Sequence, residues 1–273
     1  MCGIVGYTGF QDAYDIVING LRRLEYRGYD SAGIVLEDKN NNFEVKKTKG
    51  KVSDLVAISE NLKGTSHIGM GHTRWATHGV PSDRNSHPHV SNDGKIALVH
   101  NGIIENYDTI KTMLIGKGFT FLSETDTEVL VNLIQYILDT QNVDFPQAVR
   151  YALNEVYGAY AITVMHKDYP GVLVVGRLGS PLAIGLGDKE YFIASDASPF
   201  VEFTKEAVYL EDGHMATISL ENGVDIRSIK ENEKIEPAIQ ELKLSLEQIE
   251  KGGYEHFMLK EIFEQPKSIQ DTL

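Results

Sequence analysis

Cys2 is the only cysteine in the 273-residue chain, and its position can give it two reactive groups. Removal of Met1 leaves Cys2 as the first residue, with a thiol and a free α-amine. The reference pKa of an α-amine is about 7.7–8.0 and that of a thiol about 8.5, so the amine can take the thiol proton near neutral pH. This pairing of nucleophile and base is what covalent catalysis needs. Cys2 is therefore our candidate nucleophile, and the plainer alternative is a small buried residue in an edge strand.

A thiolate that attacks a carbonyl carbon needs hydrogen-bond donors directed at the oxyanion that forms. Asn101 and Gly102 directly follow a predicted strand over Lys95–His100. The side-chain amide of Asn101 and the backbone N–H of Gly102 are candidates for this oxyanion hole. The alternative is an Asn-Gly hairpin turn. The helical pattern that follows from Ile103 weakens that alternative, because a hairpin needs a second strand there.

Two charged residues have the chemistry to hold an α-amino acid. Arg74 ends a predicted strand over His67–Arg74, and its guanidinium fits a carboxylate through two parallel hydrogen bonds. A surface ion pair is the alternative for Arg74. Asp126 can neutralise an ammonium group, and as an alternative or in addition it can cap a helix. Trp75, the single tryptophan, is expected in a core or over a pocket.

The histidines His78, His87 and His89 fall in one long polar segment and raise the question of a metal site. No compact ligand spacing with an acidic third ligand accompanies them, so we expect no metal. The plainer interpretation is that they hold backbone or substrate. We also expect no cofactor.

Composition and charge exclude several classes of function. The net charge is −13 and the isoelectric point about 5.1, so the surface repels phosphate backbones and anionic lipid. No apolar run approaches the roughly 18 residues that span a bilayer. No signal peptide is visible. The expectation is a cytoplasmic protein with neither nucleic acid nor membrane as a partner.

The order of the predicted elements indicates an α+β fold with two sheets and helices outside them. A group of strands comes first, helices dominate the middle, and strands return after residue 160. We expect one domain over residues 2–230, and a linker with the start of a second half over residues 231–273. The predicted central helices are Asp108–Gly116, Thr127–Asp139 and Phe145–Val156, the second preceded by a capping-box pattern from Thr125 to Glu128.

Several longer runs of sequence resemble a known family. Residues 1–6 are similar to the start of class II glutamine amidotransferases, which are N-terminal-nucleophile hydrolases. Within that class, the resemblance is to the glutamine–fructose-6-phosphate aminotransferases. It is carried by residues 22–33, 74–79, 85–89, 123–128 and 260–266.

The resemblance implies a four-layer α/β/β/α sandwich and the hydrolysis of glutamine to glutamate and ammonia. It implies that Cys2 is the nucleophile and that Asn101 and Gly102 form the oxyanion hole. It also implies that Arg74 holds the α-carboxylate of glutamine and that Asp126 holds its α-ammonium.

The remaining implications concern a loop and the partners. Thr77 and His78 would line the glutamine site, and Trp75 would act as a gate toward the ammonia path. The implied partners are glutamine and the family's C-terminal sugar-phosphate isomerase domains, which bind fructose-6-phosphate and are missing from this chain. Two alternatives stay open. One is a different ammonia acceptor, as in amidophosphoribosyltransferase, and the other is a glutamine-binding module without catalysis.

Overall fold

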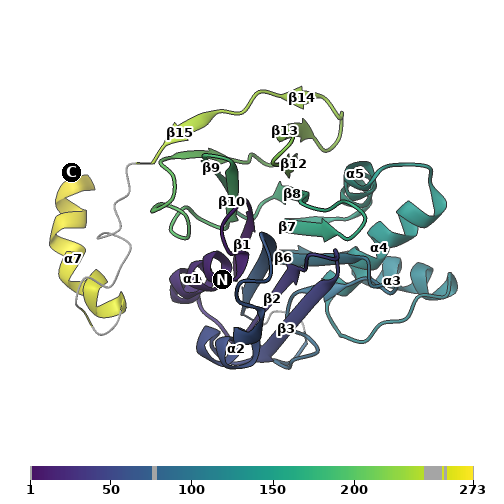
Figure 1. Ribbon diagram of the computed structural model, residues 1–273, viewed down its shortest axis with the longest axis horizontal. Coiled ribbons are helices and arrows are strands. Elements are labelled where there is room, and N and C mark those ends of the chain that lie inside the picture. The colour runs from purple at the N-terminus through teal and green to yellow at the C-terminus, as the bar shows by residue number, and fades with distance from the viewer. Residues whose placement is uncertain (1, 76–78, 243–253, 255–256, 273) are drawn as a thin grey trace.

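The computed structural model describes residues 2–75, 79–242, 254 and 257–272. Its strands form two sheets in which every strand pairs antiparallel with its neighbours (Figure 1). The first sheet has the order β15-β11-β9-β10-β1-β4-β2-β3, and the second has the order β14-β13-β12-β8-β7-β6-β5. β1 therefore lies inside the first sheet, and β6 lies near one edge of the second.

The strand bounds follow the chain through both sheets. Those of the first sheet are β1 (Gly3–Thr8), β2 (Ser31–Glu37), β3 (Phe43–Lys49), β4 (Ile68–Arg74), β9 (Ala183–Gly187), β10 (Glu190–Ala194), β11 (Glu206–Tyr209) and β15 (Ile239–Glu241). Those of the second sheet are β5 (His89–Val90), β6 (Ile96–Ile104), β7 (Gly158–His166), β8 (Leu173–Leu178), β12 (His214–Ser219), β13 (Gly223–Ser228) and β14 (Lys234–Ile235).

Helices cover the outer faces of the two sheets. α1 (Ala13–Leu24) and α2 (Val52–Ser59) pack on the first sheet, and α3 (Tyr107–Gly116), α4 (Asp126–Thr140) and α5 (Phe145–Glu155) lie with the second. α7 (Phe257–Thr272) lies on the opposite side of the molecule from α3, α4 and α5 (Figure 1).

Caps fix where the helices begin. The Asp144 side chain accepts a hydrogen bond from the Gln147 N–H at 2.9 Å and starts α5. Thr125 accepts from the Glu128 N–H at 3.3 Å and starts α4, as the capping-box pattern predicts. The Glu128 carboxylate accepts from the backbone N–H groups of Leu122 and Ser123, and not from the N–H of the cap residue Thr125.

Three separate apolar clusters confirm the four-layer α/β/β/α sandwich. One lies between the first sheet and α1 and α2, one lies between the two sheets, and one lies between the second sheet and α3, α4 and α5. Strand residues alternate between clusters: Ile4 faces the other sheet and Val5 faces α1. Both faces of the central strands are therefore buried.

The structure corrects the predicted end of one strand. The sequence places Asn101 and Gly102 just after a strand, whereas β6 continues to Ile104 in register with β7. Gly102 permits this because it has φ +134°, and a Cβ atom there would lie 1.9 Å from the carbonyl oxygen of Ala159. The dipeptide is thus neither a hairpin turn nor a segment beyond the strand.

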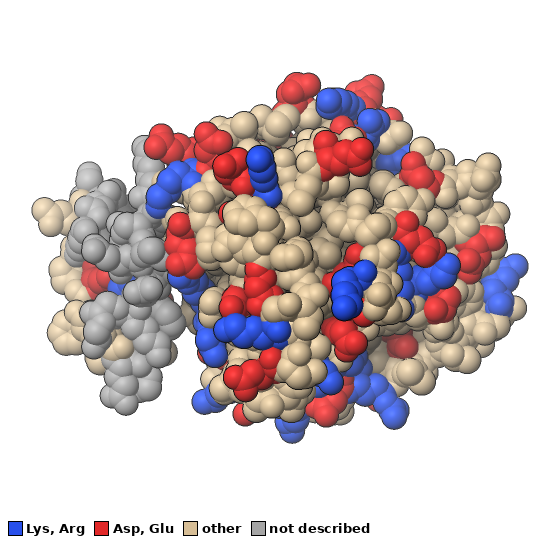
Figure 2. All heavy atoms as spheres, viewed as in Figure 1, with Lys and Arg blue, Asp and Glu red and all other residues tan. Residues whose placement is uncertain are grey.

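Two further observations concern the ends of the domain and its surface. β14 and β15 join the second and the first sheet beyond residue 230. Acidic and basic side chains are intermixed over the face seen in Figure 2. Among the residues that the structure describes, no helix combines the length and the apolar character needed to cross a bilayer.

Candidate active site

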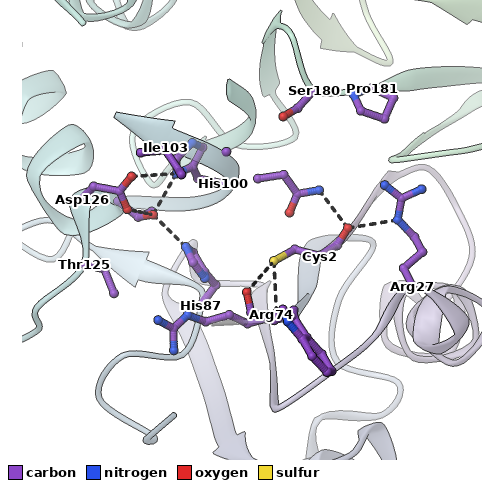
Figure 3. Close-up of a pocket in the computed structure, with 14 residues that line it drawn as sticks. Cys2, Arg27, Arg74, His87, His100, Ile103, Thr125, Asp126, Ser180 and Pro181 are labelled. Carbon is purple, nitrogen blue, oxygen red and sulfur yellow. Dashed lines mark hydrogen bonds and ion pairs between the residues drawn. The ribbon is translucent and has the colours of Figure 1, made fainter. Parts of the chain in front are cut away.

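A cavity of about 350 Å³ brings together most of the residues that the sequence singled out (Figure 3). Cys2 precedes β1, and Asn101 and Gly102 lie near the end of β6, which contacts β1 across the two sheets. Thr77 and His78 lie outside the described residues. The predicted residues that line the cavity are Cys2, Arg74, Trp75, Asn101, Gly102 and Asp126.

Hydrogen bonds fix the position of Cys2. Its Sγ accepts from the Trp75 N–H at 3.1 Å, and its carbonyl oxygen accepts from Arg27 Nε at 3.1 Å and from Asn101 Nδ2 at 3.2 Å. Burial raises the pKa of the Cys2 thiol, while the Trp75 hydrogen bond and the charge of Arg74 oppose the rise. Since the raised pKa leaves the sulfur protonated near neutral pH, attack by this sulfur requires a base.

The side chain of Asn101 lies directly beside the backbone of Cys2. Besides the bond to the Cys2 carbonyl, its Nδ2 donates to Ser195 Oγ at 3.0 Å, and the same Oγ accepts from the Ile4 N–H at 2.9 Å. An amide group held this close to Cys2 can donate to the oxyanion that forms on a carbonyl oxygen when the sulfur attacks the carbonyl carbon.

Arg74 and Asp126 place opposite charges on the wall of the same cavity. Arg74 is 4% exposed at the end of β4, and its Nη2 donates to the Gly79 carbonyl at 3.2 Å. Asp126 is 5% exposed in the first turn of α4, and its Oδ2 accepts from the Ile104 N–H at 2.8 Å. Asp126 therefore ties α4 to β6 and also contributes a negative charge to the cavity.

Trp75 covers part of the cavity and is not a core residue. Trp75 is 55% exposed. A Cβ atom at Gly28 would lie 2.8 Å from that ring, and Gly28 has φ +102°. The absence of a side chain at Gly28 therefore lets the indole pack against the backbone there.

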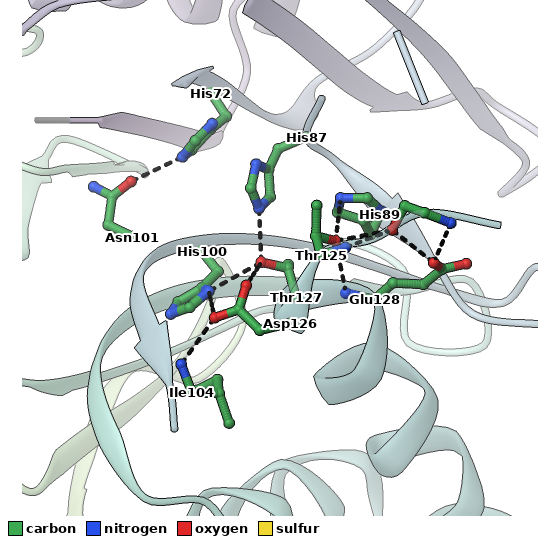
Figure 4. Close-up of polar contacts among 11 residues, drawn as sticks. His72, His87, His89, His100, Asn101, Ile104, Thr125, Asp126, Thr127 and Glu128 are labelled. Carbon is green, nitrogen blue, oxygen red and sulfur yellow. Dashed lines mark hydrogen bonds and ion pairs between the residues drawn. The ribbon is translucent and has the colours of Figure 1, made fainter. Parts of the chain in front are cut away.

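Buried histidines surround the start of α4 (Figure 4). His87 Nε2 and His100 Nδ1 lie 2.8 and 3.0 Å from Thr127 Oγ1, and His89 Nε2 lies 3.0 Å from Thr125 Oγ1. Burial lowers the pKa of His87, His89 and His100, so the three rings are neutral at physiological pH. In the described part of the chain, no group of His, Cys, Asp and Glu residues is arranged to hold a metal ion.

Sequence reasoning missed some residues that complete the site. Arg27 and His100 line the cavity, and Ser195 holds the Asn101 amide. His100 directly precedes the candidate Asn101 in β6, so its position in the sequence could have singled it out. Ser195 follows β10, and the pairing of β10 with β1 brings it beside Ile4 and Asn101.

Comparisons with known proteins agree with this architecture. A family model described as "Glutamine amidotransferase domain" matches residues 59–255. The glutamine–fructose-6-phosphate aminotransferases (isomerizing) of Bacteroides thetaiotaomicron and Chlorobaculum tepidum are each 52% identical to this chain over its whole length. The chain spans 44% of the length of these relatives.

Solved structures share the fold. The glutamine phosphoribosylpyrophosphate amidotransferase from B. subtilis, complexed with ADP and GMP, superposes with a TM-score of 0.71 at 29% identity, covering 85% of this chain and 50% of that one. A glutamine aminotransferase class-II domain protein from Silicibacter pomeroyi superposes with a TM-score of 0.57 at 16% identity, covering 84% of this chain and 99% of that one.

The fold is that of the N-terminal-nucleophile amidotransferases, with two packed antiparallel sheets between layers of helices. The family model covers more than half of the sequence. The chain belongs to the glutamine amidotransferase domain family.

Proposed function

We propose that this chain hydrolyses the side-chain amide of glutamine through a thioester on Cys2. The observation that carries the proposal is the shared cavity of Cys2, Asn101, Arg74 and Asp126 in a glutamine amidotransferase domain. A guanidinium and a carboxylate suit the two charges of an α-amino acid. The amide carbon of the bound glutamine then lies toward Cys2.

The reaction proceeds in two halves. The α-amine of processed Cys2 takes the thiol proton, and the sulfur forms a bond to the amide carbon. The resulting oxyanion accepts hydrogen bonds from Asn101 Nδ2 and the Gly102 N–H. The C–N bond breaks as the α-ammonium gives its proton to the departing ammonia, which leaves a γ-glutamyl thioester. Water then loses a proton to the same amine and attacks, and the C–S bond breaks to release glutamate and restore the thiol.

The α-amine is needed because the thiol pKa is raised by burial. A free thiolate is scarce near neutral pH, so the thiol must give up its proton as it attacks, and an amine with a pKa of about 7.7–8.0 beside the sulfur can accept that proton. If Met1 remains attached, the same nitrogen is an amide and cannot accept a proton.

We further propose that the ammonia serves fructose-6-phosphate in a longer protein whose isomerase domains follow this chain. Relatives that are 52% identical over the whole chain are named for that acceptor, and this chain spans 44% of their length. Trp75 is suited to gate the ammonia path because its exposed ring lies at the cavity. Thr77 and His78 follow it in sequence, and we propose that they close over glutamine.

A second candidate is an amidotransferase that serves phosphoribosyl pyrophosphate. The similarity to the B. subtilis structure favours it, but that similarity is 29% identical in sequence, against 52% for the first candidate. Fusion of the chain to the isomerase half of a close relative separates the two. Production of glucosamine-6-phosphate supports the first candidate, and its absence from a fusion that still hydrolyses glutamine contradicts it.

Glutamate release from glutamine tests the central proposal, including the alternative of a binding module without catalysis. Intact mass first establishes that Met1 is absent, and the same protein with Met1 retained is the control. We expect hydrolysis by the processed form alone, and Cys2→Ala should reduce it by roughly 10⁵-fold. A processed protein that binds glutamine without hydrolysing it overturns the proposal. Hydrolysis by the Met1-bearing form removes the α-amine from the mechanism.

A further inference from the structure

The side-chain amide of Asn101 is held at both ends, and Figure 4 shows the contact of its oxygen with His72. Its Nδ2 donates to the Cys2 carbonyl and to Ser195 Oγ, at 3.2 and 3.0 Å. Its Oδ1 lies 2.8 Å from His72 Nε2. His72 is fully buried in β4, on the same face of the strand as Arg74.

The partners of this amide fix which atoms carry protons. A backbone carbonyl only accepts, so the Asn101 group that faces Cys2 must be the NH2. The group that faces His72 is then the amide oxygen, which only accepts. His72 must therefore donate from Nε2, which selects one tautomer of its neutral ring. Burial lowers the pKa of His72 to about 3, so the ring is neutral near physiological pH.

The arrangement also leaves an amide hydrogen available for the reaction. The Cys2 carbonyl accepts from Arg27 Nε as well as from Asn101, so it keeps a donor when the Asn101 N–H turns to the oxyanion. The Ser195 and His72 contacts remain to hold the amide during that exchange. Without the His72 donor, no hydrogen bond among the described residues holds the oxygen end against a half-turn of the amide. Such a half-turn would direct the amide oxygen toward the developing negative charge.

We propose that His72 is a positioning residue for glutamine hydrolysis, and that its Nε2–H keeps the Asn101 amide turned with its NH2 group toward the Cys2 reaction centre. The inference rests on the proposed function. His72 is not among the residues that line the cavity, and it acts through its contact with Asn101.

Two variants of matched length isolate the hydrogen bond. His72→Gln keeps an N–H at a similar reach, and His72→Met fills similar space without a donor. We expect His72→Met to lower kcat by about 10- to 100-fold with KM for glutamine unchanged, because an oxyanion donor acts in the transition state. His72→Gln should restore most of the loss. The matched control is His166→Met, a buried histidine at the opposite end of β7 from the residues paired with Asn101 and Gly102.

A double-mutant cycle with Asn101→Ala separates positioning from general damage. Asn101→Ala alone should cost roughly 100- to 1,000-fold in kcat. If His72 acts only through Asn101, His72→Met should change kcat by less than about twofold in the Asn101→Ala background. Two results overturn the inference but leave the proposed function intact. In one, His72→Met lowers kcat in the Asn101→Ala background as much as in the wild type. In the other, His166→Met lowers kcat as much as His72→Met does.

A measurement on the wild-type chain keeps the test decisive if His72→Met does not fold. The ¹⁵N chemical shifts of His72 should report the Nε2–H tautomer between pH 6 and about pH 9. The Nδ1–H tautomer overturns the inference. A processed wild-type chain that hydrolyses no glutamine overturns both the inference and the proposed function.

Discussion

A single residue of this cavity can both hold the fold together and set the charge of the cavity. Asp126 supplies a negative charge to the cavity, and the same carboxylate accepts the Ile104 N–H and so anchors α4 to β6. His100 Nδ1 lies 4.0 Å from the same oxygen. An alanine at this position would remove the anchor and the charge together. A substitution that tests the charge must therefore keep an acceptor.

Asp126→Asn makes that separation. The asparagine oxygen can still accept from the Ile104 N–H, and the new NH2 can donate to Thr127 Oγ1, which contacts Asp126 Oδ1 at 3.4 Å. We expect KM for glutamine to rise by about 10- to 100-fold, because the proposed buried partner of the substrate ammonium is lost. We expect kcat and the thermal midpoint to change little. Steady-state kinetics and calorimetry measure these quantities.

Asp144→Asn is the matched control for this prediction. Asp144 also stands at the start of a helix, where it accepts from the Gln147 N–H, and asparagine caps a helix about as well as aspartate. It should leave KM unchanged. An unchanged KM in Asp126→Asn would mean that the ammonium group of glutamine binds elsewhere.

At the scale of the element, β6 carries the proposed oxyanion donors Asn101 and Gly102, and it continues past the point where its sequence predicts an end. Gly102 and Gly118 both have positive φ, at +134° and +94°. A Cβ atom at Gly102 would collide with the Ala159 carbonyl of β7, whereas a Cβ atom at Gly118 would meet nothing within 4 Å. Alanine variants at the two positions therefore separate the free-energy cost of the positive-φ backbone from that of the collision with β7.

We expect Gly102→Ala to reduce the free energy of unfolding by about 3 kcal/mol or more, because β7 must move away from β6. Gly118→Ala should cost about 1–2 kcal/mol, the penalty for left-handed backbone alone. Chemical denaturation of both variants measures the difference. Equal losses would mean that β6 and β7 accommodate a methyl group without separating.

The sequence predicted most of these elements but not their partners. The predicted helix Thr127–Asp139 matches α4 because the capping-box pattern from Thr125 to Glu128 marks its start. The end of β6 was missed because Asn-Gly is a strong local turn signal, and only pairing with β7 overrides it. His72 shares a strand face with Arg74, so its orientation was accessible from spacing, but its contact with Asn101 depends on how the two sheets pack.

At the scale of the whole molecule, the four layers bring distant parts of the chain to one cavity. Cys2, Arg74, Asn101 and Asp126 come from a strand start, two strand ends and a helix start. Each of these residues lies at or near the end of its strand or helix, and all four line the cavity. The expected domain limit at residue 230 is harder to argue from sequence, because the segment beyond it is charged, and its short strands are recognisable only through their partners.

That limit is open to a direct test with two truncated chains. β15 pairs with β11 at the edge of the first sheet, the Leu242 N–H donates to the Lys205 carbonyl at 2.7 Å, and the Leu242 side chain is 8% exposed in the cluster beneath α1 and α2. A chain that ends after residue 242 keeps these contacts, and one that ends after residue 230 loses them.

Burial of a leucine side chain contributes about 2 kcal/mol, which in a domain of this size corresponds to a change in melting temperature of roughly 4–8 °C. We therefore expect the chain that ends at residue 230 to melt at least that much lower than the chain that ends at residue 242. Both should hydrolyse glutamine at the temperature where both are folded, since no residue beyond 230 lines the cavity among those described. Calorimetry at matched concentration measures the midpoints. Equal midpoints would place the end of the folded domain at residue 230, with β14 and β15 adding nothing to its stability.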